Sequence, residues 1–299
     1  MTIISRWCVL LLLLIAPWAH AMNAIIYQPQ LRDMSADKSQ WRTLMDTLRD
    51  AGFDTLVLQW SEYGSAFSQG EEQQWLMDRA RVAHDRGLHI VVGLHADPEF
   101  FTRQNQPVKA LGNYLNRQRT QDVAVAQRWI DKFGSANIAG WYLTPELDDL
   151  RWRDETSRSV AVKWLTETKQ SLLAVADKPV SISSFFAGNM TPDTYRDTVA
   201  DFAATGVKIW VQDGAGVDKL SQRERSLYLN TTVGCEKTSP AAGEVFEIFR
   251  QIKGDKAFHA QPASAQEISS VLRQTSACGK DKLIFSLRYL PAAVGILAY

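Results

Sequence analysis

Short apolar segments alternate with amphipathic segments along most of the chain. The apolar segments are nearly continuous, which is typical of parallel strands that are buried on both faces. They cover residues 23–28, 54–60, 88–94, 138–143, 179–186 and 207–211. Between them, apolar residues recur at helical spacing in residues 39–50, 71–86, 107–133, 158–176 and 191–206. This alternation predicts an α/β fold with a parallel sheet.

Six such strands in about 210 residues extrapolate to eight strands by the end of the chain. We therefore expect a single (β/α)8 TIM barrel, a fold that usually takes roughly 250 residues. The eighth strand is predicted at residues 282–287, after a helix at residues 267–277.

The seventh strand is ambiguous in the pattern. Residues 241–249 fit a strand, but Val245, Ile248 and Phe249 also fit one face of a helix. Residues 257–260 are the competing segment. Periodicity does not choose between the two.

The first 21 residues are predicted to be a signal peptide and not part of the fold. Arg6 precedes an apolar run at residues 8–15, and residues 19–21 have the A-x-A form of a cleavage site. The run is too short to cross a bilayer, which takes about 20 residues. We therefore expect an exported, periplasmic protein whose mature domain spans residues 22–299, without stable membrane insertion. An uncleaved N-terminal anchor is the alternative.

The charge balance argues against two classes of partner. Lys+Arg and Asp+Glu both number 33, so the chain lacks the basic excess that a nucleic acid or an acidic lipid surface would require. After residue 21 the chain holds two cysteines, Cys235 and Cys278. In an exported protein they can form one disulfide, and two separate thiols are the alternative.

Polar and aromatic residues are concentrated where the predicted strands end. In a TIM barrel the active site is built from the loops at these C-terminal ends. Amides and carboxylates hydrogen-bond hydroxyl groups, and aromatic rings provide flat apolar surfaces, so the combination favours a carbohydrate and requires no cofactor. The residues at these ends are Gln28, Gln59, Trp60, His95, Asp97, Glu146, Asp148, Asp149, Phe185, Phe186, Gln212, Asp213, Arg288 and Tyr289.

The fourth predicted strand, residues 138–143, delivers the strongest candidate acid. We expect the strand to end before Pro145, because proline cannot donate a hydrogen bond to a sheet. Glu146 follows at once. Trp141 and Tyr142 upstream would lower the local polarity and raise the pKa of Glu146, as a general acid requires.

Glycoside hydrolysis needs a second carboxylate, supplied by another strand. Asp213, on the sixth predicted strand, and Glu244, on the seventh, are the candidates. The alternative for the acids after Pro145 is a solvated acidic loop paired with Arg151 and Arg153.

Several of the other candidates also have a purely structural interpretation. Trp60 and Phe185 could serve packing alone. His95 and Asp97 resemble part of a metal site, but such a site needs three or four ligands, and we expect no metal. The sequence contains no Gly-rich phosphate loop, no G-x-S-x-G and no H-E-x-x-H.

Three motifs of the chain occur together in one family. Gly140-Trp-Tyr-Leu-Thr-Pro-Glu-Leu-Asp-Asp149, Val211-Gln-Asp-Gly-Ala-Gly-Val217 and Gly243-Glu-Val-Phe-Glu247 follow one another in this order. They resemble the WYL-x-x-E-x-D-D, QDG-x-G-V and E-x-F-E segments of a bacterial secreted family catalogued as domain of unknown function 4434. The resemblance covers essentially the whole chain after residue 21.

The resemblance implies a glycoside-hydrolase-like TIM barrel of the kind found in exopolysaccharide-related settings. It also favours residues 241–249 as the seventh strand and Glu244 as the second carboxylate. Glutamates after strands four and seven are the arrangement of a large clan of retaining glycosidases. This chain departs from that clan because Pro145 stands where the clan has an asparagine that binds the sugar 2-hydroxyl, which leaves the roles of the acids open.

We therefore expect an exported glycoside hydrolase that cleaves a bacterial polysaccharide or oligosaccharide with retention. Glu146 is the expected general acid/base and Glu244 the expected nucleophile. One alternative is a non-catalytic saccharide-binding barrel that assists polysaccharide export, with the export machinery as a partner. Another is a metal-dependent hydrolase or a lyase on the same scaffold. The residues predicted to bind substrate are Gln28, Gln59, Trp60, His95, Asp149, Gln212, Asp213 and Tyr289.

Overall fold

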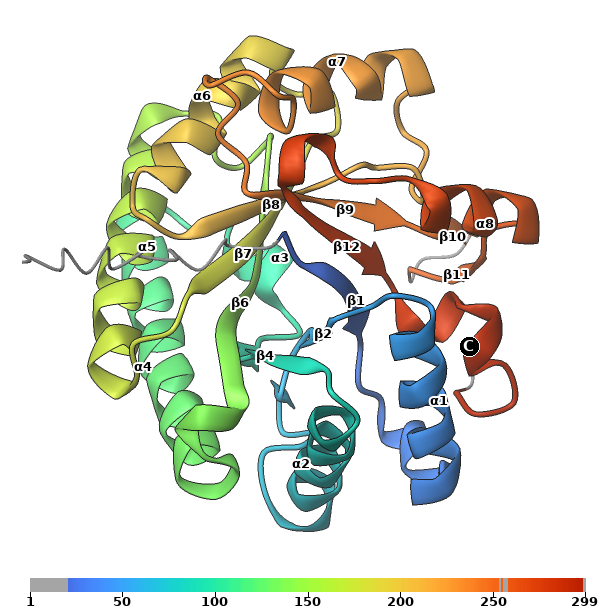
Figure 1. The fold of residues 1–299 in the computed structure, drawn as a ribbon. Helices are drawn as coiled ribbons and strands as arrows, with labels where there is room; N and C mark the ends of the chain where they lie inside the picture. The colour runs from blue at the N-terminus through green and yellow to red at the C-terminus, as the bar shows by residue number, and fades with distance from the viewer. Residues whose placement is uncertain (1–20, 253, 255–257, 298–299) are drawn as a thin grey trace, which may run out of the picture.

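The chain folds into a closed barrel of eight parallel strands surrounded by helices (Figure 1). The computed structural model describes residues 21–252, 254 and 258–297. The barrel strands are β1 Asn23–Tyr27, β2 Thr55–Leu58, β4 His89–Gly93, β6 Ile138–Asp148, β7 Val180–Phe185, β8 Lys208–Gln212, β9 Gly243–Glu247 and β12 Asp281–Phe285. They follow one another around the barrel in chain order, and β12 pairs with β1 to close it. The predicted TIM barrel is confirmed.

Helices follow the strands along the chain and surround the barrel, except that the short α3 lies across one end of it (Figure 1). They are α1 Lys38–Asp50, α2 Gly70–Asp85, the short α3 Phe100–Arg103, α4 Val108–Phe133, α5 Glu155–Val175, α6 Pro192–Ala203, α7 Gln222–Thr232 and α8 Ala265–Arg273. The pattern of apolar residues did not predict α7. Its start carries a local signal nonetheless, because Ser221 and Glu224 form a capping box.

The seventh barrel strand is β9, as the family resemblance implied. Val245 contributes to the barrel interior and Phe246 packs toward the helices, so the segment alternates with the period of a strand. The chain then forms β10 Phe249–Gln251, which pairs antiparallel with β11 Ala260–Pro262 outside the barrel. Of the competing segment 257–260, residue 257 lies outside the described residues, and Ala260 belongs to β11.

Strand β6 runs past the point where the sequence predicted its end. It continues through Pro145 to Asp148, so the predicted end before the proline was wrong. Against β7, the four steps from Leu143 to Leu147 on β6 correspond to only two steps from Ile182 to Ser184. This mismatch is a bulge, and residues in a bulge are not paired with the neighbouring strand. Pro145, which has no N–H, therefore removes no hydrogen bond from the sheet. The bulge also redirects the side chains of residues 144–146.

Two apolar layers hold the barrel together. The larger one fills the space between strands and helices. Inside the barrel, the rings of Tyr142 and Trp210 stack with centroids 5.7 Å apart and an angle of 13° between their planes. They form the floor below the C-terminal ends of the strands. The inner layer consists of Ala24, Ile26, Val57, Val91, Tyr142, Trp210, Val245 and Leu283.

Cys235 and Cys278 are joined by a disulfide, with their Cα atoms 5.4 Å apart. The predicted pairing is therefore confirmed. Within the described part of the chain, no helix is long and apolar enough to cross a membrane. The predicted signal peptide, residues 1–21, lies outside the described residues except for residue 21.

Candidate active site

A cavity of about 600 Å³ opens at the C-terminal ends of the barrel strands. Residues close to the ends of five strands line it, namely Gln28, Gln59, Glu146, Gln212 and Glu247. TIM-barrel enzymes hold their substrates at this end of the barrel. The volume is also in the range of small-molecule binding sites.

Glu146 reaches the cavity because it lies in the β6 bulge. Its neighbours Thr144 and Pro145 line the same wall, which a regularly alternating strand would not allow. Burial in these surroundings raises the pKa of Glu146 to about 7, and a hydrogen bond from Gln212 opposes part of the rise. Near neutral pH this carboxyl group can therefore hold a proton and donate it.

Glu247 also lines the cavity, as Glu146 and Asp97 do, and the sequence analysis did not select it. It is the last residue of β9 and is buried. One oxygen of its carboxylate accepts the N–H of Gly216 at 2.7 Å. Burial and the charge of Asp213 raise the pKa of Glu247, and the charge of Glu146 adds to the rise. The two glutamates therefore interact electrostatically across the cavity.

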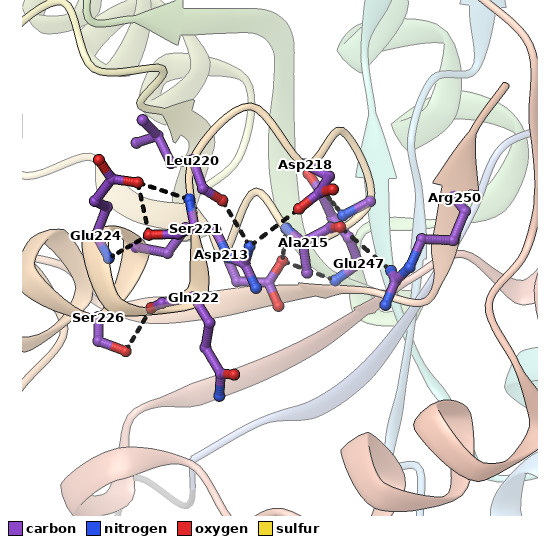
Figure 2. Close-up of polar contacts among 12 residues, drawn as sticks. Asp213, Ala215, Asp218, Leu220, Ser221, Gln222, Glu224, Ser226, Glu247 and Arg250 are labelled. Atoms are coloured by element: carbon purple, nitrogen blue, oxygen red, sulfur yellow. Dashed lines mark hydrogen bonds and ion pairs between the residues drawn. The ribbon is translucent and has the colours of Figure 1, made fainter. Parts of the chain in front are cut away.

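Asp213 holds the loop after β8 against Glu247 from outside the cavity. Its carboxylate accepts the backbone N–H groups of Ala215 at 3.0 Å and of Glu247 at 3.2 Å. Figure 2 shows these contacts together with the bond from the loop to Glu247. Burial raises the pKa of Asp213, and the two N–H groups oppose that rise by favouring its charged form. Asp213 was predicted to orient the substrate, but it does not line the cavity.

Glu244, the predicted nucleophile, does not line the cavity either. Along β9, Val245 and Glu247 face the interior of the barrel, and Glu244 shares the outer face with Phe246. Burial and the nearby charge of Asp213 raise the pKa of Glu244 to about 8. The glutamate of β9 that lines the cavity is Glu247, three positions further on, because side chains of a strand alternate between its faces. Its place at the end of β9 is the signal that could have identified Glu247.

The cavity floor is polar at one point. The hydroxyl group of Tyr142 and that of Ser183 lie 2.8 Å apart within hydrogen-bonding distance. The amide of Gln212 donates to Ser183 at 3.3 Å. Gln212 therefore connects the Tyr142–Ser183 pair to Glu146. It lines the cavity, as expected of a residue predicted to bind substrate.

Further amide side chains line the walls. Gln28 and Gln59 were predicted to bind substrate, and Gln118 from α4 and Gln251 from β10 join them. The side-chain oxygen of Gln59 is buried and has no hydrogen-bond partner in the described structure. A buried acceptor without a partner is costly, and Gln59 holds this acceptor in the wall of the cavity.

Trp60 lines the cavity as predicted. Its indole N–H donates to the carbonyl oxygen of Pro29 at 3.1 Å, which fixes the ring. Phe185, which also had a packing alternative, lines the cavity as well. Both rings are partly exposed, so each combines packing with an accessible surface.

Three other predicted substrate ligands lie elsewhere. His95, in β5 His95–Ala96, contacts Glu62 at 3.4 Å and lines a neighbouring cavity of about 470 Å³. Asp149 is fully buried and accepts N–H groups of Asn189 and Met190, so it anchors the loop after β7. Tyr289 packs on Phe249, with ring centroids 5.7 Å apart, outside the set of lining residues.

The stretch after Glu146 is not a solvated acidic loop. Asp148 and Asp149 are both buried. Asp148 accepts the side-chain N–H of Gln104 at 3.0 Å and the backbone N–H of Leu150 at 2.8 Å. These acids stabilise the turn that follows β6 and leave Glu146 as the acid of this segment that lines the large cavity. Within the described residues, no three His, Cys, Asp or Glu side chains are grouped to hold a metal ion.

The fold is that of a TIM barrel like those of glycoside hydrolases. A GH18 chitinase from Cycas revoluta matches with a TM-score of 0.52 at 12% identity, over 91% of this chain and 97% of that chain. The catalytic domain of β-amylase from Paenibacillus polymyxa matches with 0.52 at 8% identity, over 90% and 93%. A GH18 chitinase from Pseudoalteromonas aurantia matches with 0.51 at 12% identity, over 88% and 93%. At such identities the likeness establishes the fold.

The chain belongs to the family described as "Domain of unknown function (DUF4434)", whose sequence model matches residues 22–294. It is also 50% identical over 290 residues to "Uncharacterized protein YbcH" of Escherichia coli (strain K12), which covers 97% of each chain. The family resemblance that the three sequence motifs indicated is thereby confirmed.

Proposed function

We propose that the protein is an exported glycoside hydrolase of a bacterial polysaccharide, with Glu146 and Glu247 as its catalytic residues. One observation carries the proposal: glutamates at the ends of the fourth and seventh barrel strands line one cavity, and burial raises the pKa of both. Two carboxyl groups on either side of a glycosidic bond are the requirement for its hydrolysis.

The reaction would proceed in two steps. Glu146 donates its proton to the glycosidic oxygen while the ionised Glu247 attacks the anomeric carbon. The bond to the leaving sugar breaks, and a glycosyl ester of Glu247 forms. Glu146 then takes a proton from a water molecule, whose oxygen attacks the anomeric carbon and releases Glu247. Two inversions at this carbon leave its configuration retained.

The surroundings of Glu146 support its role, and one contact of Glu247 favours the ionised form of that residue against the effect of burial. A pKa of about 7 keeps Glu146 protonated in a substantial fraction of molecules at neutral pH. The N–H of Gly216 donates to the carboxylate of Glu247 and stabilises its charged form. Substrate that fills the cavity displaces water from both groups and strengthens these interactions.

A saccharide is the substrate class that fits the walls. Amide groups of Gln28, Gln59, Gln212 and Gln251 can exchange hydrogen bonds with hydroxyl groups. The aromatic rings between them offer apolar faces to the C–H groups of a sugar. The neighbours in fold, which are two chitinases and a β-amylase, support the same class.

The cellular setting follows from the N-terminal segment. Residues 1–21 have the form of a signal peptide, and the Cys235–Cys278 disulfide suits an oxidising compartment. We propose a periplasmic location, a mature domain that spans residues 22–299, and polysaccharide export machinery as a partner.

The decisive experiment is a reducing-end assay of residues 22–299 against a panel of bacterial exopolysaccharides. Glu146→Gln is expected to lower the rate by about 10²- to 10⁴-fold, because it removes the general acid. Glu247→Gln is expected to abolish release. Glu244→Gln is the matched control on the outer face of the same strand, and it should retain activity. Release that survives both Glu146→Gln and Glu247→Gln would refute the assignment.

Azide distinguishes the role of each glutamate. With Glu247→Ala, azide can attack the anomeric carbon from the vacated face, which gives a glycosyl azide of inverted configuration. With Glu146→Ala, azide replaces water on the glycosyl ester, which gives the retained configuration. The opposite pairing would exchange the two roles.

A non-catalytic saccharide-binding barrel is the second candidate. Pro145 favours it, because a proline immediately before Glu146 provides no side-chain hydrogen bond to a sugar hydroxyl group. Binding of a polysaccharide without release by the wild-type protein, unaffected by Glu146→Gln, would select this candidate.

A further inference from the structure

Three aromatic side chains are exposed on the described surface, and all three line the cavity. Tyr63 is 40% exposed, Phe101 50% and Phe258 58%, and each is part of the cavity wall. No other Phe, Tyr or Trp among the described residues is exposed to this degree. Exposed apolar surface that gathers around one cavity marks a binding surface and not a random feature of the exterior.

A second ring supports each exposed ring from behind. The supporting rings are buried or partly buried, so the exposed rings are held in place before any ligand arrives. A ligand that stacks on a pre-positioned ring loses little side-chain entropy on binding. The centroid distances are 4.7 Å for Trp60–Tyr63, 6.3 Å for Phe101–Phe185 and 5.8 Å for Phe249–Phe258.

The three rings belong to different loops around the mouth. Tyr63 lies in β3 Glu62–Tyr63, which follows the second barrel strand, and Phe101 lies in α3, which follows the third. Phe258 lies between β10 and β11, which follow the seventh strand. The third and seventh strands, β4 and β9, are four positions apart in either direction around the closed barrel. Phe101 and Phe258 therefore follow strands on opposite sides of the ring.

We propose that these rings are stacking platforms for a polysaccharide chain that lies across the mouth, with sugar units bound on both sides of the two glutamates. Apolar C–H faces of the sugars stack on Tyr63, Phe101 and Phe258. The proposal rests on the proposed function in one respect, because it specifies where that hydrolase cuts. A chain held at both ends of the cavity is cut at internal bonds, whereas a site for chain ends would hold sugars on one side of the glutamates.

Binding is tested first, in a protein that cannot cleave. Residues 22–299 carrying Glu146→Gln are run through gels that contain hydroxyethyl cellulose, xylan, alginate or glycol chitin. For the polymer that retards the protein, Tyr63→Ala, Phe101→Ala and Phe258→Ala should each weaken binding about two- to tenfold, since one aromatic contact is removed. Leu173→Ala is the matched control, because Leu173 is 49% exposed on α5, outside the cavity lining.

Two binding results would overturn the proposal. One is a protein that none of the four polymers retards. The other is retardation that only one side of the mouth supports, so that either Phe101→Ala or Phe258→Ala has no more effect than Leu173→Ala. Equal weakening of polymer binding by Phe101→Ala and Phe258→Ala supports the proposal.

Cleavage is tested separately with the wild-type protein. The molecular mass of the retained polymer, followed by size-exclusion chromatography, should fall before short sugars accumulate. Early release of single sugars from a polymer of unchanged mass would overturn binding across the mouth. If binding depends on all three rings but no bond is cleaved, the platforms stand and the hydrolase proposed above fails.

Discussion

Asp213 acts on Glu247 without entering the cavity. Its carboxylate accepts the N–H of Glu247 at 3.2 Å, and its negative charge raises the pKa of the glutamate carboxyl group. The nucleophile proposed here, Glu247, must be ionised to react, so the charge of Asp213 opposes that state while its carboxylate holds the backbone of Glu247 in place. Asp213 is therefore a positioning residue.

Asp213→Asn is expected to shift the pH profile of hydrolysis. Asparagine keeps an oxygen that can accept the same N–H groups but removes the negative charge. The pKa of Glu247 then falls, so its ionised form persists to lower pH. The acidic limb of kcat/KM should move down by about one pH unit. Asp218→Asn, an exposed residue of the same loop, should leave the profile unchanged, and an upward shift in Asp213→Asn would contradict the argument.

Glu244 is expected to make folding stability depend on pH. Its pKa is about 8 in the folded protein, against roughly 4.3 in an unfolded chain. As the pH rises between these values, the unfolded state loses the proton first, so the free energy of unfolding decreases. Glu244→Gln removes this effect and should stabilise the protein by about 1 to 3 kcal/mol at pH 8, and little at pH 4.

Urea unfolding at several pH values measures the difference between Glu244→Gln and the wild type. Glu267 provides the contrast, because a hydrogen bond from Ser264 lowers its pKa to about 2. Glu267→Gln should therefore destabilise the protein near neutral pH. A stability difference for Glu244→Gln that does not change with pH would contradict the environment described for this residue.

The loop after β8 leaves no room for a side chain at Gly216. A Cβ atom there would lie 2.5 Å from the ring of Phe249, which packs against Phe285 and Tyr289. The N–H of Gly216 also donates to Glu247. Glycine is therefore required for the loop to approach Glu247, the proposed nucleophile, closely.

Gly216→Ala should displace this loop and lower kcat/KM by about 10²-fold, as displacements of about 1 Å can do. The fold should persist, which circular dichroism can verify. Gly112→Ala is the control, because a Cβ atom in that helical position would meet only Val160, at 4.0 Å. Undiminished activity of Gly216→Ala would show that the loop does not position Glu247.

The β6 bulge is the feature that places Glu146, the proposed general acid, in the cavity wall. A regular strand would place alternate residues of the segment on its outer face. The bulge instead brings residues 144–146 to one wall. The same element therefore combines a rigid buried strand with an irregular end, as strands beside binding sites often do.

Two interactions join loops of the barrel that are far apart in the sequence. Arg288 forms a buried ion pair with Asp33 at 2.8 Å, which connects the segment after the last strand to the segment after the first. The disulfide between Cys235 and Cys278 spans 43 residues and connects the loops that precede β9 and β12. Loops that precede the strands of a TIM barrel serve stability.

Replacing both cysteines by serine should lower the free energy of unfolding by about 2 to 4 kcal/mol, because the unfolded chain gains entropy. Activity of the folded variant should be unchanged, since neither cysteine lines the cavity. Equilibrium unfolding in urea, with and without a reductant for the wild type, measures the loss. An unchanged midpoint in the variant would contradict the expected contribution.

Much of the architecture could be predicted from local patterns. Seven barrel strands were predicted from apolar segments, and the helix predicted from residue 191 is α6, where the Thr191 side chain accepts the N–H of Thr194 as a cap. These signals are local because burial and capping act over a few residues. The seventh strand could be predicted only from the family resemblance, because the spacing of apolar residues around Val245 fits both a strand and a helix.

The site could be predicted only in part. Gln28, Gln59, Trp60, Glu146 and Gln212 line the cavity as expected. His95, Asp149, Asp213 and Tyr289 follow strand ends as well, but packing turns them toward other neighbours. A position at a strand end is necessary for a cavity residue and does not determine where the side chain points.

The order of apolar and amphipathic segments is sufficient to specify a TIM barrel and the end at which its cavity forms, because those follow from periodicities of a few residues. The choice between Glu244 and Glu247 depends on which face of β9 meets the barrel axis, and the position of Glu146 depends on a bulge measured against β7. The exposed rings come from residues 63, 101 and 258, which only chain closure brings around one cavity. Such relations join distant parts of the chain, so no local pattern contains them.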